Sequence, residues 1–169
     1  AYTLELARHC DFWVGVNTSW PNRALKEAWR RGLLPGVSGG EFKAEARAGD
    51  SRLDGLVNQP DGRRLWVECK NVTLAEDDVA WFPDAASERG RKHLRTLMEL
   101  RAKGDRAALF YLVHSPDARC FAPADFIDPE YAELFHQALA AGVEVWPFMT
   151  RITLQGLDIA GLLPLAPQQ

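Results

Sequence analysis

Hydrophobic and polar positions alternate with a period of two in two neighbouring segments, Ser51–Val57 and Arg64–Lys70. Between these segments, the sequence Gln59-Pro60-Asp61-Gly62 contains a proline with fixed φ and a glycine that tolerates positive φ, which is typical of a hairpin turn. The pattern therefore predicts two antiparallel strands joined by a tight turn.

Three polar residues of this hairpin are expected to lie together. Asp54 of the first strand comes beside Glu68 of the second. Glu68 and Lys70 are two residues apart and share one face of their strand, because successive side chains point to opposite faces. The other face carries the apolar residues Leu65, Val67 and Cys69. We expect the apolar face to pack in the core and the polar face to be exposed.

Two carboxylates and a lysine in this arrangement suit a magnesium-dependent phosphodiesterase. A hard cation such as Mg2+ prefers oxygen ligands, so two carboxylates suffice when waters and a substrate phosphate complete the shell. The ammonium of Lys70 could orient an attacking water or stabilise charge on the phosphoryl group. Alternating Glu and Lys is also typical of a solvated strand face, and this structural interpretation stays open.

The rest of the pattern predicts helices and strands in alternation. Helices are expected over residues 21–31, 87–103 and 129–141, and strands over 41–47, 107–113 and 143–148, with one more strand within 153–165. Residues 71–84 are expected to form a long connection of functional interest. This order of elements predicts an α/β fold, with a mixed central sheet flanked by helices.

Composition narrows the class of protein. The 169 residues, 47% apolar and 25% charged, are enough for one globular domain with a hydrophobic core. No apolar stretch is long enough to cross a bilayer, and the acidic N-terminal residues do not resemble a signal peptide, so we expect a cytoplasmic protein without a membrane partner. The three cysteines lie far apart, which argues against a disulfide framework or a zinc site.

Charge is distributed unevenly along the chain. The net charge of -3 argues against a constitutive nucleic-acid binder, but the residues after Cys120 carry most of the acidic excess. Basic residues gather in the first two predicted helices, where Arg23, Lys26, Arg89 and Lys92 are candidate contacts to nucleic-acid phosphates. Such clusters are also common on solvated helix faces.

Longer phrases along most of the chain resemble the sugar fermentation stimulation protein A family. The phrases include Ser51–Asp54, Val67–Leu74, Phe82–Ala85, Phe121–Asp125 and Asp128–Tyr131. They are much more specific than the Asp and Glu-x-Lys pattern alone, and they run over most of the sequence.

The resemblance implies a restriction-endonuclease-like core of the PD-(D/E)xK type. Asp54 and Glu68 then match the metal carboxylates and Lys70 the motif lysine, with Mg2+ or Mn2+ as cofactor and DNA as partner. Glu27 matches an acid of the first helix that some such nucleases use as an extra metal ligand. A surface ion pair with Arg30 explains Glu27 equally well.

The resemblance also bears on domain organisation. Family members usually carry an OB-like barrel before this region, and Tyr2–Leu6 looks like the closing strand of such a barrel. We therefore expect residues 1–169 to form a single nuclease-like domain, in which residues 1–12 could be the remnant of a preceding OB-like domain.

Three functions of different classes follow from these observations. The leading hypothesis is a metal-dependent nucleic-acid phosphodiesterase in which Asp54, Glu68 and Lys70 are catalytic. The alternative is a non-catalytic DNA-binding or regulatory protein that retains the nuclease fold. A third is a structural or protein-interaction domain, in which the tryptophans belong to the core or to an interface. No residue pattern indicates sugar chemistry.

Overall fold

A mixed sheet of six strands forms the centre of the protein, in the order β11-β10-β8-β5-β4-β3. The computed structural model describes residues 6–9, 12–15, 19–153 and 156–167. The bounds of the six strands are β3 Glu41–Ala48, β4 Ser51–Asn58, β5 Arg64–Val72, β8 Arg106–Val113, β10 Glu144–Thr153 and β11 Gly156–Leu162. The predicted hairpin is the antiparallel pair of β4 and β5, whereas β5, β8 and β10 run parallel to one another.

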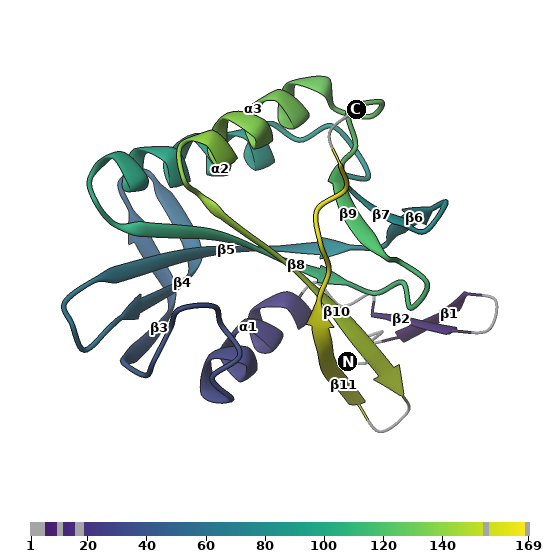
Figure 1. Cartoon of the computed structure of the whole chain (residues 1–169), viewed down its shortest axis with the longest axis horizontal. Helices are drawn as coiled ribbons and strands as arrows, with labels where there is room; N and C mark the ends of the chain where they lie inside the picture. The colour runs from purple at the N-terminus through teal and green to yellow at the C-terminus, as the bar shows by residue number, and fades with distance from the viewer. Residues whose placement is uncertain (1–5, 10–11, 16–18, 154–155, 168–169) are drawn as a thin grey trace, which may run out of the picture.

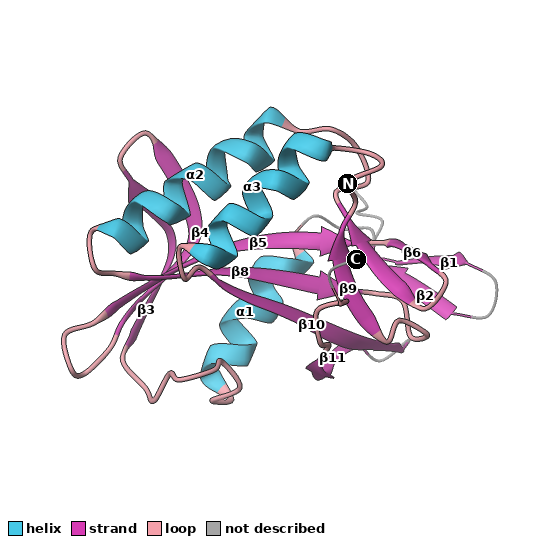
Figure 2. Ribbon diagram, turned by 45° about the horizontal axis from the view of Figure 1, so that its top comes forward, coloured by secondary structure: helices cyan, strands magenta, loops and turns pink. Residues whose placement is uncertain are grey.

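Helices cover both faces of this sheet (Figure 1). They are α1 Trp20–Arg30, α2 Glu88–Ala102 and α3 Pro129–Ala140. Figure 2 shows α2 and α3 side by side on one face, with α1 on the other. Capping side chains fix two of the helix starts, because Ser87 accepts a hydrogen bond from the Gly90 N–H and Asp128 accepts one from the Tyr131 N–H. The prediction of a mixed sheet flanked by helices is confirmed.

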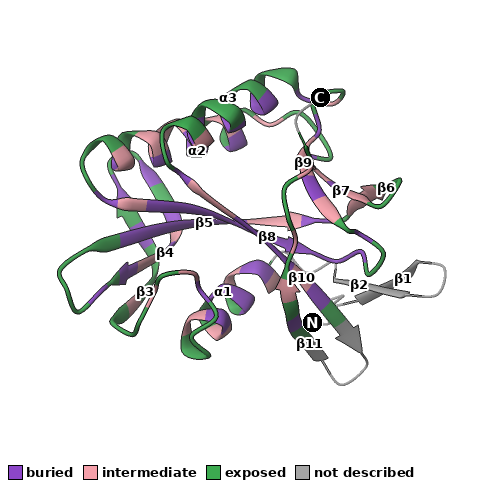
Figure 3. Ribbon diagram, in the orientation of Figure 1, coloured by how far each residue is buried: buried purple, intermediate pink, exposed green. Residues whose placement is uncertain are grey.

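Two hydrophobic cores lie on the two faces of the sheet, so the central strands are buried on both (Figure 3). Leu25 of α1 packs with Val67 on one face, and Leu94 of α2 packs with Tyr111 on the other. The expectation that the polar face of β5 is exposed is wrong. Glu68 is only 4% exposed, because the helices on that face cover it.

A smaller sheet stands beside the central one, in the order β6-β7-β9. Its strands are β6 Leu74–Glu76, β7 Val79–Phe82 and β9 Cys120–Pro123, and a separate pair is formed by β1 Leu6–His9 and β2 Phe12–Gly15. The interpretation of residues 71–84 as one long connection is therefore corrected. Asp77 and Asp78, with φ of 50° and 63°, form the tight turn between β6 and β7. The predicted closing strand over residues 2–6 lies almost entirely outside the described residues.

Gly55 allows α1 to lie close against β4. A Cβ atom at this position would come within 2.8 Å of Leu25 Cδ2 and 3.2 Å of Phe42 Cε2. We expect Gly55→Ala to lower the free energy of unfolding by about 1–3 kcal/mol, because fully buried Leu25 has little room to move. Urea denaturation of parent and variant measures this difference. An unchanged stability would contradict the close packing of α1 on β4.

Within the described part of the chain, the helices are too short or too polar for any of them to cross a membrane.

Candidate metal centre

Asp54 lies where β4 separates from β5. The pairing of the two strands reaches only as far as Gly55 and Val67. Beyond that point the backbone N–H of Cys69 donates a 2.7 Å hydrogen bond to Asp54 Oδ2, so the carboxylate takes the place of a backbone partner. The next strand is irregular at the same level, because Glu45 of β3 has a left-handed φ of 53° within a strand. Such irregularities re-aim side chains and are common beside active sites.

The same bend changes which way β4 faces. Leu53 packs in the core under α2 and α3, whereas Val57 packs in the core under α1, although the two residues are four apart along one strand. A regular strand would present both side chains to the same face, since side chains alternate with a period of two. The change of face occurs between Leu53 and Val57, next to Asp54.

Helix α1 also reaches Asp54. Asn22 Nδ2 donates a 2.9 Å hydrogen bond to Asp54 Oδ1. The pKa of Asp54 is nonetheless raised, chiefly by burial and then by the negative charge of Glu68, which together outweigh the hydrogen bonds from Cys69 and Asn22. A divalent cation beside the two carboxylates would relieve this repulsion.

The two oxygens of the buried Glu68 carboxylate differ, because one has hydrogen-bond partners and the other has none. Lys70 Nζ donates a 2.7 Å hydrogen bond to Oε1, and His93 Nδ1 of α2 contacts the same Oε1. The other oxygen, Oε2, is buried and has no hydrogen-bond partner. Burial alone would raise the pKa of Glu68, but the hydrogen bond from His93 and the charge of Lys70 lower it, so the group is held as a carboxylate.

The tautomer of His93 follows from these contacts. Since Glu68 Oε1 can only accept, His93 Nδ1 carries the proton that lies between them. The 3.2 Å approach of Lys70 Nζ to His93 Nδ1 is then a contact between two donors that serve the same oxygen. Lys70 therefore donates one of its three N–H groups to Glu68, and the other two can donate to a water or a phosphate oxygen.

The donor set suits a hard divalent cation. A buried carboxylate oxygen without a partner is costly, and a bound cation would satisfy Glu68 Oε2 while stabilising ionised Asp54. The described residues contain no cluster of three or more His, Cys, Asp or Glu side chains at metal-binding geometry. Waters or substrate oxygens would therefore complete the shell, as is usual for Mg2+.

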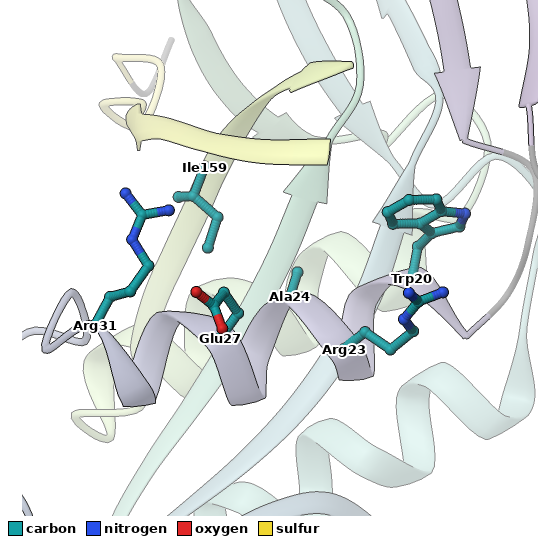
Figure 4. Close-up of a pocket in the computed structure, with 6 residues that line it drawn as sticks. All are labelled: Trp20, Arg23, Ala24, Glu27, Arg31 and Ile159. Carbon is teal, nitrogen blue, oxygen red and sulfur yellow. The ribbon is translucent and has the colours of Figure 1, made fainter. Parts of the chain in front are cut away.

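The structure places the third predicted metal ligand elsewhere. Both carboxylate oxygens of Glu27 accept hydrogen bonds from Arg30, at 2.9 and 2.8 Å. Glu27 lines a pocket on the side of α1 that faces β11 (Figure 4), and the hydrogen bond from Arg30 is the main reason why its pKa is lowered. The structure thus brings Asp54, Glu68 and Lys70 together but does not bring Glu27 to them.

The predicted nucleic-acid contacts lie on the two helices that supply Asn22 and His93. Arg23, Lys26, Arg89 and Lys92 are all exposed. The Arg23 guanidinium lies 5.0 Å from the centroid of the Trp20 ring, and Lys92 Nζ donates a 3.4 Å hydrogen bond to the Asp50 carbonyl.

Sequence reasoning missed Asn22 and His93. His93 lies next to Leu94 in a stripe of α2 that is otherwise apolar and buried, and a histidine within such a stripe is a signal that it meets a buried polar partner. Asn22 gave no such signal, because a polar residue in the first turn of a helix is ordinary.

His93 is expected to support cation binding through Glu68. Its N–H holds Oε1 and thereby orients the whole carboxylate, so we expect His93→Leu to weaken Mn2+ binding by about 10–100-fold. Calorimetric titration with Mn2+ measures the affinity. His136→Leu on the exposed side of α3 is the matched control and should bind like the parent. Equal affinities of the two variants would contradict a role for His93.

Comparisons with known proteins agree with this architecture. Residues 19–156 match the family model SfsA, described as "Sugar fermentation stimulation protein RE domain". A sugar fermentation stimulation protein homolog of Syntrophobacter fumaroxidans is 57% identical over 159 residues, which cover 94% of this chain and 60% of the relative. A homolog of Maridesulfovibrio salexigens is 55% identical over 168 residues, covering 98% and 70%. The chain thus spans between about three fifths and seven tenths of these relatives.

A solved structure shows the same fold. It is described as "The structure of Pyrococcus Furiosus SfsA in complex with Ca2+", and it is 31% identical to this chain with a TM-score of 0.90, over 97% of this chain and 71% of the other. The family match, the identities and the shared fold agree with one another. The chain therefore belongs to the SfsA family of sugar fermentation stimulation proteins.

Proposed function

We propose that this protein is a divalent-metal-dependent phosphodiesterase that acts on nucleic acid, with Asp54 and Glu68 as the metal ligands and Lys70 as the residue that positions the attacking water. The observation that carries the proposal is the buried Oε2 of Glu68, which has no hydrogen-bond partner. Asp54 lies close enough to Glu68 to feel its charge, and Lys70 donates a hydrogen bond to the other oxygen, Oε1. The relative from Pyrococcus furiosus was solved with Ca2+, which supports a divalent-cation site. Mg2+ or Mn2+ is the cofactor that we propose for this chain.

Each residue has a distinct task in this proposal. Asp54 is fixed by Asn22 and Cys69, so its carboxylate is oriented before a ligand arrives. Glu68 presents one oxygen to the cation, and Lys70 directs a remaining N–H toward the water that attacks phosphorus. A divalent cation, when bound, supplies Lewis-acid activation of the phosphate and neutralises its charge.

The proposed partner is DNA, contacted through the exposed basic residues of α1 and α2. Arg23 and Lys26 lie on the helix that holds Asn22, and Arg89 and Lys92 lie on the helix that holds His93. Cations on both helices would contact phosphates of a strand that runs past the centre. We further propose that residues 1–169 form one nuclease-like domain and that the protein acts in the cytoplasm.

Cleavage of labelled DNA tests the proposal directly. Single-stranded and double-stranded substrates are incubated with parent and Asp54→Asn in the presence of Mn2+ or Mg2+. We expect metal-dependent product with the parent and loss of product with the variant, because the amide carries no charge to hold the cation. Product from the variant at the parental rate, or product that persists in EDTA, would reveal a contaminating nuclease.

A non-catalytic DNA-binding protein is the second candidate. The observation that favours it is the direct ion pair between Lys70 and Glu68, which ties the lysine to a ligand oxygen. This alternative predicts DNA binding without product, and an affinity that falls steeply as salt is raised. Binding measured at several salt concentrations, in parallel with the cleavage assay, separates the two candidates.

A further inference from the structure

A polar pocket lies on the side of α1 that faces β11. It has a volume of about 250 Å³ and is lined by Trp20, Arg23, Ala24, Glu27, Arg31 and Ile159. Glu27 and Arg31 follow Asn22 by five and nine residues, so they lie about 140° and 180° around the helix axis from it. Glu27 and Arg31 therefore lie on a different side of α1 from Asn22, whereas Arg23, about 100° from Asn22, lies between the two sides.

The walls of this pocket combine two cations with apolar surface. Figure 4 shows Arg31 and Trp20 at opposite ends of the row of side chains, with Ala24 and Glu27 on the helix between them and Ile159 across from the helix. Arg23 lies against Trp20 as a cation–π pair, with its guanidinium 5.0 Å from the ring centroid. This contact holds the Arg23 side chain at the rim of the pocket.

The acids at the pocket are already neutralised. Arg30 engages both oxygens of Glu27, and Arg31 donates a 2.6 Å hydrogen bond to Asp158 of β11. These hydrogen bonds from Arg30 and Arg31 are the main causes that lower the pKa of Glu27 and of Asp158. Among the residues that the structure describes, Arg23 has no carboxylate partner within ion-pair distance. Arg23 is thus left without a carboxylate, and Arg151, which lies opposite Asp158 across β10 and β11, adds a further positive charge nearby.

We propose that this pocket binds one phosphate group through Arg23 and Arg31, as an anion site separate from the metal centre. Arginine is well suited to phosphate, because its planar fork donates two parallel hydrogen bonds. The excess of positive charge around the pocket favours an anionic phosphate group. The volume of about 250 Å³ is slightly below the usual range of ligand pockets, which begins at about 300 Å³. It suits a phosphate with its attached sugar rather than a large cofactor.

The phosphate could come from a nucleic-acid strand or from a free phosphorylated molecule. Calorimetric titrations in EDTA use three probes, namely a thymidine pentanucleotide, thymidine 5′-monophosphate and inorganic phosphate. Preferential binding of the pentanucleotide identifies a strand phosphate, and preferential binding of the other two identifies a free phosphate. EDTA removes divalent cations, so the result stands whether or not the proposed function is correct.

Variants locate the binding. Arg23→Ala and Arg31→Ala should each weaken the binding of the preferred probe at least about tenfold, because each removes one charge-assisted phosphate contact. Arg23→Gln, which keeps the packing on Trp20, should lose as much affinity as Arg23→Ala. Arg119→Ala removes an exposed positive charge next to β9, outside this pocket, and should bind like the parent. Failure of all three probes to bind, or equal affinity of parent and pocket variants, would overturn the proposal.

Discussion

Glu68→Gln is expected to weaken Mn2+ binding by more than about 100-fold. The amide keeps the shape of the side chain but removes the charge and the second acceptor oxygen that a hard cation needs. Among the described residues of the centre, Glu68 Oε2 is the only buried carboxylate oxygen without a hydrogen-bond partner. No neighbouring side chain can therefore take its place as a cation ligand. Titration calorimetry at fixed pH measures the loss, and DNA cleavage should be lost with it.

The same substitution should also reduce stability. Lys70 and Glu68 form a buried ion pair, with side chains 12% and 5% exposed, and breaking such a pair costs about 3 kcal/mol. Circular dichroism at the titration temperature must therefore show a folded variant. Glu99→Gln, which removes an exposed carboxylate from α2, is the matched control and should change neither property. Parental Mn2+ affinity in folded Glu68→Gln would place the cation elsewhere.

Lys70→Met is expected to lower the cleavage rate by about 10²–10⁴-fold while Mn2+ affinity stays within about tenfold of the parent. Loss of a positioned proton donor or water-orienting group typically costs this much in rate. Both carboxylates remain, and His93 still contacts Glu68 Oε1, so the cation ligands keep their positions. Single-turnover cleavage at saturating Mn2+ measures the chemical step without a contribution from cation affinity.

Lys103→Met, at the C-terminal end of α2, is the control for loss of a positive charge. A parental cleavage rate in Lys70→Met would remove Lys70 from the chemistry. A parallel fall in rate and Mn2+ affinity would instead assign Lys70 to holding Glu68.

The hairpin that carries the centre was predictable from sequence because its signals are local. The alternation over Ser51–Val57 and Arg64–Lys70 and the proline and glycine of the turn act within a few residues, and the structure has strands at these positions. The pattern of the remaining segments predicted the mixed sheet and its flanking helices, and the family resemblance pointed to the same core. Asp54, Glu68 and Lys70 could be singled out because the hairpin turn brings their strands together and longer phrases of the sequence resemble a known family.

The surroundings of the centre could not be predicted because they depend on packing between distant elements. Glu68 is buried because α2 covers β5, which strand alternation does not reveal. The bend at Asp54 depends on β3 as well as β4, and the contact to Asn22 depends on Gly55 admitting α1. The short strands β6 and β7 escaped notice because their carboxylate-rich turn resembles a solvated loop.

Diffraction from crystals soaked in Mn2+, recorded at a wavelength with a strong manganese anomalous signal, would locate a cation bound at this hairpin. We expect an anomalous peak within about 2.5 Å of Glu68 Oε2 and of an Asp54 carboxylate oxygen, with the peak absent in Glu68→Gln crystals soaked in the same way. A peak at another place, or no peak at saturating Mn2+, would contradict a metal centre at this hairpin.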